Sequence, residues 1–460
     1  MLGMTKHIHL VGIGGIGMSG IAEILLNLGF QVSGSDLKGG EITDNLEHLG
    51  ATIYIGHDGR SVENADVVVI SSAIVEGNPE LIAAKMARIP IIPRAEMLAE
   101  LMRMKRCSIA VAGSHGKTTT TSVLATVLAA AELDPTVVVG GRVDAIGSNA
   151  RLGEGDTFVT EADESDGSFL LLDPTLAVVT NIDLEHLDHY SGMEHLKRTF
   201  LDFINKVPFY GACILCVDDE NIRAILPSVR KRMLTYGLTK DADFRATDLH
   251  TDGFYTSFTA HHHGRELGRI TMPLPGRHMV QNALAVLAVA QELEVPFDIT
   301  AKTVAAFTGV RRRFQRIGEV NDILLIDDYG HHPTEIKATL AAARAAFDRR
   351  LIVAFQPHRY TRTRDLFDEF LTTFSGADKL FMTDIYAASE APIEGVTTQK
   401  VVDGIRAMGQ RDTEYFPDQD DMLAAMLDEV KPGDLVLTLG AGDLNQFIVR
   451  LQQKLQEKFA

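Results

Sequence analysis

The sequence predicts an α/β protein of three domains, each built on a mostly parallel sheet. Length is the first observation: 460 residues exceed what a single core of at most about 300 residues accommodates, so about three units are expected. The second is an alternation of short apolar strands with helical stretches, which is typical of parallel βαβ units. The third is that glycine turns and acids directly follow the strands, as a nucleotide site requires. We place the domains at residues 1–106, 107–310 and 311–460.

The composition excludes several classes of protein. Hydrophobic residues make up 45% and charged residues 23% of the chain, which is the balance of a folded globular protein. A formal net charge of −18 leaves no basic excess to replace phosphate counterions, so we expect no nucleic-acid binding. Apolar runs end well before the ~20 residues of a membrane span, and the start lacks the features of a signal peptide. We therefore expect no membrane insertion and a cytoplasmic location.

Two motifs that suggest metal or redox chemistry favour structural roles instead. Cys213 and Cys216 form a C-x-x-C, but it lies within the apolar run GACILCVDDE, which we interpret as a buried strand. With Cys107 they are too few for a disulfide framework. The three histidines at 261–263 lie in the polar middle of an alternating stretch, where we expect an exposed hairpin.

In the first domain, five strand-like runs alternate with helical stretches. The runs are IHLVGIG, QVSGSD, TIYIG, ADVVVISSAI and IPIIPR, and MSGIAEILLNLG is helical with a glycine at its end. Between the first strand and that helix, residues 12–17 read G-I-G-G-I-G, which matches G-x-G-x-x-G. Glycines permit the close approach of a diphosphate, and the helix N-terminus offers N–H groups and a positive dipole.

Asp36 closes the next strand, about 20 residues further on, where an acid accepts from a ribose or sugar hydroxyl. Taken alone, this pattern predicts a dinucleotide or a similar diphosphate ligand. A nicotinamide-dependent dehydrogenase is one interpretation, and a tight turn without a ligand is another.

The second domain begins with a stronger motif. Residues 113–120 read G-S-H-G-K-T-T-T between the strand SIAVAG and the helix TTTSVLATVLAAA. Backbone amides of such a loop cradle phosphates, Lys117 would bridge the β and γ oxygens, and Thr118 could ligate Mg²⁺. The loop departs from the standard P-loop, because its spacing before Gly116 is shorter and Val111 occupies the usual first glycine position.

Acidic and polar side chains follow two later strands of this domain. They are Glu161, Asp163, Glu164 and Asp166 in EADESDGS, and Asn181, Asp183, His186 and Asp188 in TNIDLEHLDHY. Four acids in six positions are costly unless cations or water neutralise some of them. Mg²⁺ prefers oxygen ligands but accepts one imidazole when phosphates and water fill the other positions.

The rest of the chain predicts an antiparallel excursion and a third α/β domain. Residues 241–275 are rich in threonine and alternate in polarity, and GRHMVQNALAVLAVAQEL is a helix. The arginine-rich VRRRFQRIGEV at 310–320 marks a boundary. Beyond it, each strand ends in polar residues: ILLIDDYGHHP, RLIVAFQPHR, KLFMTDIY and DLVLTLGAGD.

Nine segments, in this order, resemble the Mur ligase family over nearly the whole chain. They are GIGGIGMSGIA, SSAI with NPE, AGSHGKTTT, EADESD, TNIDLEHLDHY, GRHMVQNALA, RRRF, DDYGHHPTE and FQPHRYTRTRDLF. The resemblance implies a Rossmann-like first domain that binds UDP, a P-loop-type central ATPase, and a Rossmann-like third domain that helps to bind the amino acid. It also assigns the first glycine loop to a UDP diphosphate rather than to NAD.

The resemblance implies roles for individual residues. The sugar nucleotide would be bound by Gly12, Gly14, Gly15, Gly17, Asp36 and Ser71. ATP would be bound by Gly113, Ser114, His115, Gly116, Lys117, Thr118, Thr119, His278, Asn282, Arg313 and Asp328. The metal would be held by Thr118, Glu161 and His186, and the amino acid by His358, Arg359 and Arg362. The catalytic set would be Lys117, Glu161, His186 and Arg359.

The implied reaction makes an amide from a carboxylate in peptidoglycan precursor synthesis. ATP with Mg²⁺, or Mn²⁺, would convert the carboxylate of UDP-N-acetylmuramate to an acyl phosphate, which L-alanine then attacks. Each pair of like charges at ~4 Å costs roughly 4 kcal/mol at an effective dielectric near ~20, so cations must gather at one point. The amine needs a base, and the candidates are His186, His331, His332 and His358.

Alternatives stay open at this point. A ligase that adds recycled tripeptide to the same sugar nucleotide is the nearest, although the first glycine loop favours the alanine-adding branch. A P-loop NTPase that acts as a switch is more distant. Several Mur ligases use a carbamylated lysine downstream of the metal-binding histidine. Here Lys197 in KRTFLDF is only a weak candidate, and we expect no carbamylation.

Overall fold

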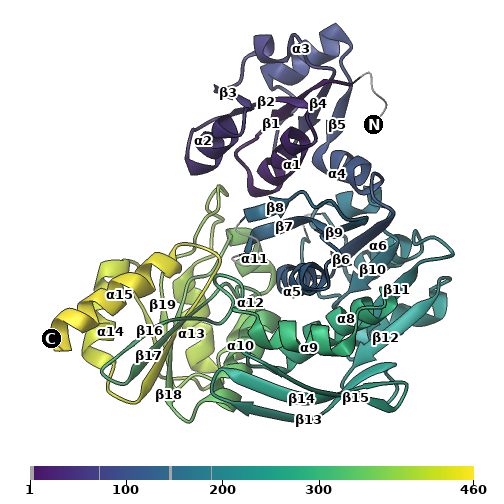
Figure 1. Ribbon diagram of the computed structural model, residues 1–460. Coiled ribbons are helices and arrows are strands. Elements are labelled where there is room, and N and C mark those ends of the chain that lie inside the picture. The colour runs from purple at the N-terminus through teal and green to yellow at the C-terminus, as the bar shows by residue number, and fades with distance from the viewer. Residues whose placement is uncertain (1–4, 72, 144–147, 188, 460) are drawn as a thin grey trace. The chain divides into compact units, whose positions relative to one another are not determined.

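A computed structural model of the protein describes residues 5–71, 73–143, 148–187 and 189–459. Three sheets run through these residues, and Figure 1 labels most of their strands and helices. The chain divides into two compact units. The first comprises Met1–Thr247, Thr259–Ile270 and Gln281–Thr308, and the second comprises Asp248–Phe258, Thr271–Val280 and Gly309–Ala460.

The first sheet has five parallel strands in the order β3-β2-β1-β4-β5. The strands are β1 (His7–Val11), β2 (Gln31–Asp36), β3 (Thr52–Ile55), β4 (Val67–Ile70) and β5 (Ile91–Pro93). The helices are α1 (Ile16–Asn27), α2 (Glu41–His48), η1 (Gly59–Val62), α3 (Pro79–Ala87) and α4 (Arg94–Met102). Helix α1 contacts α2 and α4, whereas α3 contacts η1, so both faces of the sheet are covered.

The register of this sheet aligns the carboxyl ends of three neighbouring strands. Val11 pairs with Ile70, and Ile70 pairs with Pro93. The residues that follow β1, β4 and β5 therefore emerge at one edge. The connections from β1 and β4 run to opposite sides of the sheet, and open α/β sheets bind ligands at such a switch point.

The second sheet has ten strands in the order β15-β14-β13-β12-β11-β10-β6-β9-β7-β8. The strands are β6 (Cys107–Ala112), β7 (Thr136–Val143), β8 (Ser148–Arg151), β9 (Thr157–Glu161), β10 (Leu176–Val179), β11 (Ala212–Cys216), β12 (Met233–Gly237), β13 (Phe244–Asp252), β14 (Tyr255–His262) and β15 (Arg265–Met272). The helices are α5 (Lys117–Ala130), η2 (Ser168–Leu171), α6 (Met193–Ile204), α7 (Glu220–Ile225), η3 (Leu226–Ser228), α8 (Arg277–Glu292) and α9 (Phe297–Ala306). From β7 through β9, β6, β10 and β11 to β12, every pairing is parallel.

Strands β13 to β15 are the antiparallel excursion that the sequence predicts for residues 241–275. They are neighbours in the sheet and are joined by the short turns 253–254 and 263–264, and hairpins with such turns are antiparallel. His263 has φ 48° and Gly264 has φ 78°, so the end of the histidine run forms the expected turn. His263 is exposed, but His261 and His262 are half-buried on β14, so the expectation of an exposed run is wrong for these two residues. The C-x-x-C cysteines are buried on β11, which confirms their structural interpretation.

The third sheet has the order β16-β17-β21-β18-β19-β20, and only the β16–β17 pair among these neighbours is antiparallel. The strands are β16 (Gln315–Val320), β17 (Ile323–Asp328), β18 (Arg350–Phe355), β19 (Lys379–Met382), β20 (Thr413–Tyr415) and β21 (Asp434–Leu439). The helices are α10 (Pro333–Ala346), α11 (Tyr360–Asp365), α12 (Phe367–Thr373), α13 (Thr398–Ala407), α14 (Gln419–Glu429) and α15 (Leu444–Phe459). Two apolar clusters pack on this sheet: one includes residues of α10, α12 and α13, and the other includes residues of α14 and α15.

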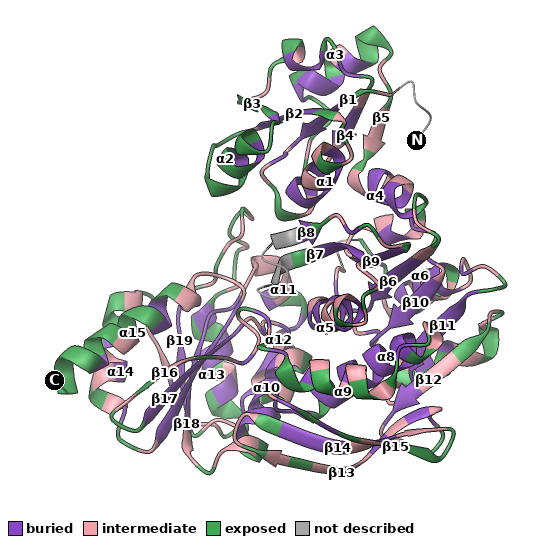
Figure 2. Ribbon diagram, in the orientation of Figure 1, coloured by how far each residue is buried: buried purple, intermediate pink, exposed green. Residues whose placement is uncertain are grey.

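The inner strands of all three sheets are mostly buried, and most helices expose one side (Figure 2). Within the described part of the chain, no helix is long and apolar enough to cross a membrane. The alternation of helices with largely parallel strands confirms the predicted α/β fold class. The domain boundaries at 106 and 310 stay predictions, because the two compact units divide the chain in a different way.

Candidate active site

The first glycine loop follows β1 and is held by the neighbouring strand β2. Gly12 has φ 82°, which L residues rarely adopt. The N–H groups of Gly12 and Ile13 both donate to the carbonyl of Ser35, at 2.8 and 3.0 Å. The N–H of Gly14 donates to Oδ2 of Asp36 at 3.0 Å. The Asp36 carboxylate therefore fixes the loop itself, and its contact with a sugar hydroxyl stays a prediction.

The other residues predicted for the sugar nucleotide lie at the same end of the sheet. Ser71 follows β4, and its N–H donates to the carbonyl of Val11 at 3.4 Å. A Cβ built on Gly12 would lie 3.5 Å from Cβ of Ser71. Gly15 is the N-cap of α1, and Gly17 lies in the first turn. The glycines thus meet at a helix N-terminus, which is suited to binding phosphate.

A buried cluster behind this loop carries no signal in the sequence. The Glu80 side chain is fully buried, and His9 Nε2 lies 3.4 Å from its Oε1. Ser35 Oγ donates to Oε2 of Glu80 at 2.6 Å, and His57 Nδ1 lies 2.9 Å from the same oxygen. Burial opposes the charged form, but the contacts from His9, Ser35 and His57 outweigh it and lower the pKa of Glu80. Because the Ser35 carbonyl also holds the loop, the cluster supports the loop from below.

The second glycine loop joins β6 to α5, and crowding makes two of its glycines necessary. Gly113 has φ 132°, and a Cβ there would lie 2.0 Å from Oγ1 of Thr180. Gly116 has φ 82°, and a Cβ there would lie 3.0 Å from Oδ1 of Asn282. Asn282 of α8 therefore lies against the loop, and its role in binding ATP stays a prediction.

The loop is tied to the segment that follows β10. Ser114 Oγ donates to the carbonyl of Asp183 at 3.1 Å, and His115 Nε2 lies 2.9 Å from Oδ2 of the same residue. The N–H of His115 donates to Oδ1 of Asn181 at 2.8 Å. Thr119, in contrast, is buried within α5, so its side chain packs inside the domain.

Lys117 begins α5, and its ammonium group is paired with a buried carboxylate. Nζ donates to Oε2 and Oε1 of Glu164 at 2.8 and 3.0 Å and to the carbonyl of Gly113 at 2.6 Å. Burial favours the neutral amine, but the charges of Glu164 and Asp163 outweigh it and raise the pKa of Lys117. Burial and the neighbouring Asp163 raise the pKa of Glu164 as well. The lysine is therefore charged at neutral pH.

Two residues predicted to hold the metal lie side by side. Thr118 Oγ1 donates to Oε2 of Glu161 at 3.2 Å. The other oxygen, Oε1, accepts from the N–H of Gly140 at 3.0 Å. A hydroxyl and a carboxylate are the oxygen donors that a hard divalent cation prefers.

The third predicted metal ligand has two acidic neighbours. His186 Nε2 lies 3.8 Å from Oε2 of Glu185 and 3.9 Å from Oε1 of Glu164. One donor atom from each of these three residues lies within 4.8 Å of the others. Two carboxylates and an imidazole suit a divalent cation. The described structure thus groups His186 with Glu164 and Glu185, and Thr118 with Glu161, so a single metal shared by Thr118, Glu161 and His186 stays a prediction. Asp188, named among the acids of this segment, lies outside the described residues.

Two residues predicted to bind ATP lie near each other in the second unit. Arg313 Nη1 is 3.6 Å from Oε1 of Glu335, and its guanidinium lies over the ring of Tyr329 at 5.1 Å. Burial and the charge of Arg313 lower the pKa of His278 to about 4. The imidazole is therefore neutral at physiological pH and can accept a hydrogen bond.

Asp328, at the end of β17, has a structural environment. It is buried and accepts from the N–H groups of Phe314 at 2.7 Å and Gly330 at 2.8 Å. Thr339 Oγ1 lies 3.3 Å from the same carboxylate. Burial raises its pKa to about 6. The carboxylate thus holds the segment before β16 and the loop after β17, and its role in binding ATP stays a prediction.

The three residues predicted for the amino acid form one cluster after β18. Arg362 Nη1 lies 3.2 Å from Nδ1 of His358, and Arg359 Nε lies 3.4 Å from Oε1 of Glu390. The His358 ring stacks on Tyr386, with centroids 5.6 Å apart and planes at 9°. Burial, followed by neighbouring cations, lowers the pKa of His358 to about 3. The cluster combines two guanidinium groups with a neutral imidazole, a set that can orient a carboxylate.

The two remaining base candidates precede α10. His332 Nδ1 accepts from the N–H of Thr334 at 3.3 Å, and Glu335 Oε2 accepts from the N–H of His331 at 3.1 Å. These contacts cap the N-terminus of α10. The His331 ring also lies 5.7 Å from that of His358.

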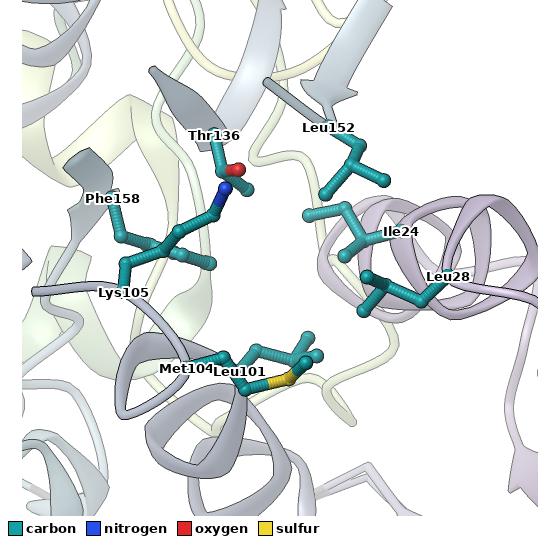
Figure 3. Close-up of a pocket in the computed structure, with 8 residues that line it drawn as sticks. All are labelled: Ile24, Leu28, Leu101, Met104, Lys105, Thr136, Leu152 and Phe158. Atoms are coloured by element: carbon teal, nitrogen blue, oxygen red, sulfur yellow. The ribbon is translucent and has the colours of Figure 1, made fainter. Parts of the chain in front are cut away.

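An apolar pocket lies at the end of α1 that is remote from the glycine loop (Figure 3). It is lined by Ile24, Leu28, Leu101, Met104, Lys105, Thr136, Leu152 and Phe158. The ammonium of Lys105 donates to the carbonyls of Gly153 and Gly155 at 2.8 and 2.7 Å. With its cation engaged and the rest of the lining largely hydrocarbon, the pocket suits packing rather than a charged nucleotide.

Several residues at the site escape sequence reasoning. The sequence shows Glu164 only as one of four acids in EADESD, and Glu185 is marked only by the histidine beside it. Tyr386 and Glu390 follow β19, far along the chain from the residues they contact. Only the neighbouring His186 offers a signal that could have located one of them.

Comparison with known proteins agrees with the resemblance. Three family models match: "Mur ligase family, catalytic domain" at residues 7–106, "Mur ligase middle domain" at 111–290, and "Mur ligase, glutamate ligase domain" at 312–442. The chain is 59% identical to the UDP-N-acetylmuramate–L-alanine ligase of Geotalea daltonii over 457 residues, covering 99% of this chain and 100% of that protein.

Solved structures give the same result. The crystal structure of the UDP-N-acetylmuramate–alanine ligase from Thermotoga maritima has a TM-score of 0.81 and 27% identity, with 99% of this chain and 100% of that chain covered. A murein peptide ligase from Psychrobacter arcticus has a TM-score of 0.70 and 25% identity, with coverages of 98% and 99%. With a relative 59% identical along almost its whole length and family models matching its three successive parts, the chain belongs to the Mur ligase family.

Proposed function

We propose that this protein joins L-alanine to the carboxylate of UDP-N-acetylmuramate at the expense of ATP, in peptidoglycan precursor synthesis. The observation that carries the proposal is the 59% identity, over 99% of the chain, to a UDP-N-acetylmuramate–L-alanine ligase. As a Mur ligase it uses ATP with a divalent cation. Mg²⁺, with Mn²⁺ as a substitute, and a cytoplasmic location are parts of the proposal.

The chemistry has two steps. A carboxylate oxygen of the sugar nucleotide attacks the γ-phosphorus of ATP, ADP leaves, and an acyl phosphate forms. The neutral amine of L-alanine then attacks the carbonyl carbon, inorganic phosphate leaves, and the amine loses a proton to a base. Both steps gather negative charge, and catalysis of such transfers is mostly positioning and electrostatic stabilisation.

The second glycine loop supplies the charge for the first step. Lys117, whose pKa is raised by the neighbouring carboxylates, lies at the loop with its ammonium group bonded to the Gly113 carbonyl, and it would neutralise the β and γ oxygens. Thr118, Glu161 and His186 would hold the divalent cation, which adds positive charge against the phosphate oxygens. When ATP binds, the ammonium group of Lys117 would move part of its hydrogen bonding from Glu164 to the phosphates, because one ammonium group cannot bond fully to both.

The remaining assignments follow the two loops and the second unit. We assign the sugar nucleotide to Gly12, Gly14, Gly15, Gly17, Asp36 and Ser71. We assign ATP to Gly113, Ser114, His115, Gly116, Thr119 and Asn282, with His278, Arg313 and Asp328 from the second unit.

The cluster after β18 is assigned to the amino acid. Arg359 and Arg362 present guanidinium groups that match a carboxylate in bidentate geometry. A histidine with a pKa of about 3 is a weak acceptor for the proton of an amino-acid ammonium group, whose pKa is far higher. His358 therefore orients the substrate rather than acting as the general base.

Phosphate release tests the proposal directly. The full-length protein is given ATP, Mg²⁺ and UDP-N-acetylmuramate, with L-alanine, a tripeptide or no amine in parallel. Turnover should require the sugar nucleotide and L-alanine together. It should fall by about 10³-fold or more in Lys117→Ala and persist in Lys85→Ala, because Lys85 is exposed on α3. Lys117→Arg keeps the charge beside Glu164, so lost turnover in that variant separates catalysis from folding.

The other outcomes discriminate among the alternatives. Turnover with the tripeptide alone would keep the family and change the amine substrate. Turnover that does not require the sugar nucleotide would sink the ligase assignment in favour of an NTPase.

A further inference from the structure

We infer that Glu390 is a positioning residue for the amine substrate, because it holds Arg359 with the outer edge of its guanidinium left for the carboxylate of L-alanine. The inference rests on the proposed function, from which it takes the substrate and the role of Arg359. No sequence motif singles out Glu390, which lies in the segment between β19 and α13. Its carboxylate nevertheless reaches back to α11, which begins directly after Arg359.

The backbone of Arg359 is held in an unusual conformation. Its φ is 71° and its ψ is 138°, a region that residues other than glycine rarely occupy and that persists only where surrounding contacts enforce it. The N–H of Arg359 donates to the carbonyl of Tyr386 at 2.8 Å, and its own carbonyl accepts from Oγ1 of Thr363 at 2.8 Å. The direction of the Arg359 side chain is therefore set partly by the segment that follows β19.

Glu390 also caps the short helix that begins after this strained residue. Arg359 is the N-cap of α11, but its side chain makes no capping hydrogen bond. Instead, Oε2 of Glu390 accepts from the N–H of Thr361 at 3.0 Å, and Oε1 accepts from Oγ1 of Thr361 at 2.6 Å. A free N–H group at the helix start is thus satisfied by a residue 29 positions further along the chain.

The same carboxylate leaves most of the Arg359 guanidinium uncommitted. Oε1 of Glu390 lies 3.4 Å from Nε of Arg359, whose side chain is 37% exposed. Within the part of the chain that the structure describes, neither Nη1 nor Nη2 of Arg359 has a hydrogen bond or an ion pair. A guanidinium binds a carboxylate through two parallel N–H groups. With Nε beside Glu390, the edge formed by Nη1 and Nη2 remains for the substrate.

The Glu390 carboxylate is charged, but it is not suited to be the base of the reaction. Burial opposes the charged form, but the hydrogen bonds from Thr361 and the charge of Arg359 outweigh it and lower the pKa of Glu390. A carboxylate with a lowered pKa is a poor acceptor for the proton of an ammonium group. Its role is therefore to hold its neighbours rather than to take a proton.

Loss of the Glu390 charge would free the side chain of Arg359. Nε would lose its charged partner, so the guanidinium would sample more orientations and the substrate would have to order it on binding. Immobilising a side chain weakens binding, whereas a side chain that is already ordered avoids this cost. The weakening should affect the ligand that Arg359 binds and should spare ATP and the sugar nucleotide.

Steady-state phosphate release by the full-length protein provides the test, with each substrate varied in turn while the other two are saturating. Glu390→Gln keeps the size of the side chain and one oxygen for Thr361, but it removes the charge beside Arg359. We expect kcat/KM for L-alanine to fall about 10-fold, chiefly through a higher KM, and KM for ATP and for UDP-N-acetylmuramate to stay within about twofold. Glu394→Gln is the matched control, because Glu394 is exposed in the same segment.

Arg359→Lys supplies a second variant, which shows whether Glu390 acts through the arginine. A lysine at this position keeps a charge but lacks the planar fork that matches a carboxylate. Adding Glu390→Gln to Arg359→Lys should lower kcat/KM for L-alanine by less than about twofold further, because both changes remove the same contact. A further loss of about 10-fold would show that Glu390 acts independently of Arg359, and the inference would fail.

The remaining outcomes separate this inference from the proposed function. If the wild-type protein shows no turnover with L-alanine, both fail together. If it turns over L-alanine and Glu390→Gln does so equally well, only the role of Glu390 is wrong. An equal rise in KM for ATP would show that Glu390 supports the fold in general. A fall in kcat with an unchanged KM for L-alanine would place its effect on a chemical step, and either result would overturn the inference.

Discussion

The two glycine loops occupy equivalent places, each between the first strand of a parallel sheet and a helix, yet they are built differently. The second loop contains its own cation, Lys117, and backs it with buried Glu164. The first loop contains no cation. Its backbone is fixed by Ser35 and Asp36, and the guanidinium that lies against its Gly17 belongs to Arg94, which directly follows another strand, β5. A loop that contains its own cation can therefore be recognised from local sequence, whereas a loop whose neighbouring cation comes from another strand cannot.

A buried glutamate lies behind each loop, and the two have opposite electrostatics. Glu80 is contacted by Ser35 and two histidines, which lower its pKa despite burial. Burial and the charge of Asp163 raise the pKa of Glu164. The first glutamate is stabilised as a carboxylate by donors around it. The second is hydrogen-bonded to the ammonium group of Lys117 and lies 3.9 Å from His186 Nε2.

Removing that lysine should have the largest effect on stability. Lys117→Ala leaves Glu164, with a side chain 1% exposed, as a buried charge without its ion-pair partner, which we expect to cost about 3 kcal/mol of unfolding free energy at pH 7. A carboxyl group with a raised folded-state pKa contributes stability below its unfolded pKa of about 4, and loses it as the pH rises through the folded value. The deficit of the variant should therefore shrink as the pH falls from 7 toward 4.

Denaturant unfolding of wild type, Lys117→Ala and the exposed control Lys85→Ala at several pH values checks this. A deficit in Lys117→Ala that stays constant with pH would contradict a dominant role of the Glu164 charge.

Replacing a loop glycine by alanine should have the next largest effect on the free energy of unfolding, and this effect should differ between the two loops. Gly113→Ala combines a φ of 132° with a Cβ 2.0 Å from Oγ1 of Thr180, and we expect a loss of about 2–3 kcal/mol. Gly12→Ala meets only ordinary contacts, the nearest at 3.5 Å from Ser71, so its φ of 82° alone should cost about 1 kcal/mol. Measuring both by chemical denaturation tests whether the second loop is packed more tightly. Equal losses would remove that distinction.

Glu80→Gln should destabilise the protein by about 1–2 kcal/mol at pH 7, because one neutral oxygen cannot serve Ser35, His9 and His57 as a carboxylate does. The sign of the pH dependence is the reverse of that for Glu164. A lowered folded-state pKa contributes stability above the unfolded value of about 4, and that stability is lost as the pH falls through the folded pKa.

The difference in unfolding free energy between wild type and Glu80→Gln should accordingly have its full size at pH 7 and decrease below about pH 4. Glu76→Gln serves as the control, since Glu76 is exposed in the loop before α3. If both glutamate variants show the same stability at every pH, the contacts behind the first loop contribute nothing through charge.

Much of this site could be predicted from the chain because its parts are local. Strand, glycine turn and helix follow one another at Gly12 and at Gly113, and the sheets confirm both units. The acids after β9 and β10 were recognisable because polar residues directly follow apolar runs. His358, Arg359 and Arg362 are one short segment, so they could be assigned together.

The rest depends on register and on long-range contacts. Arg94 reaches the first loop only because β5 aligns with β4 and β4 with β1. Glu80 reaches Ser35 across 45 positions of sequence, and Tyr386 reaches His358 from beyond the next strand. For Asp36, the sequence predicts the position at the end of the second strand. It does not predict the hydrogen bond from the loop backbone to the carboxylate, which depends on the geometry of the turn. No local pattern carries that information.

The smallest expected effect concerns Lys197, the weak candidate for carbamylation. It lies on α6 with Nζ 3.2 Å from Oε1 of Glu194, and a carbamate there would place a negative group against that carboxylate. Glu164 and Glu185 already lie beside His186, so we expect no further anion to be needed there. Lys197→Ala should change the unfolding free energy by no more than about 0.5 kcal/mol, as for other helix-surface pairs. The ligation rate should stay within about twofold of wild type, which is small against the factors of 10² to 10³ that single catalytic groups contribute. The opposite result would be that wild type depleted of carbon dioxide loses most of its ligation rate and that added bicarbonate restores it. If bicarbonate restored no activity in Lys197→Ala, a carbamylated lysine would instead lie beside the second loop.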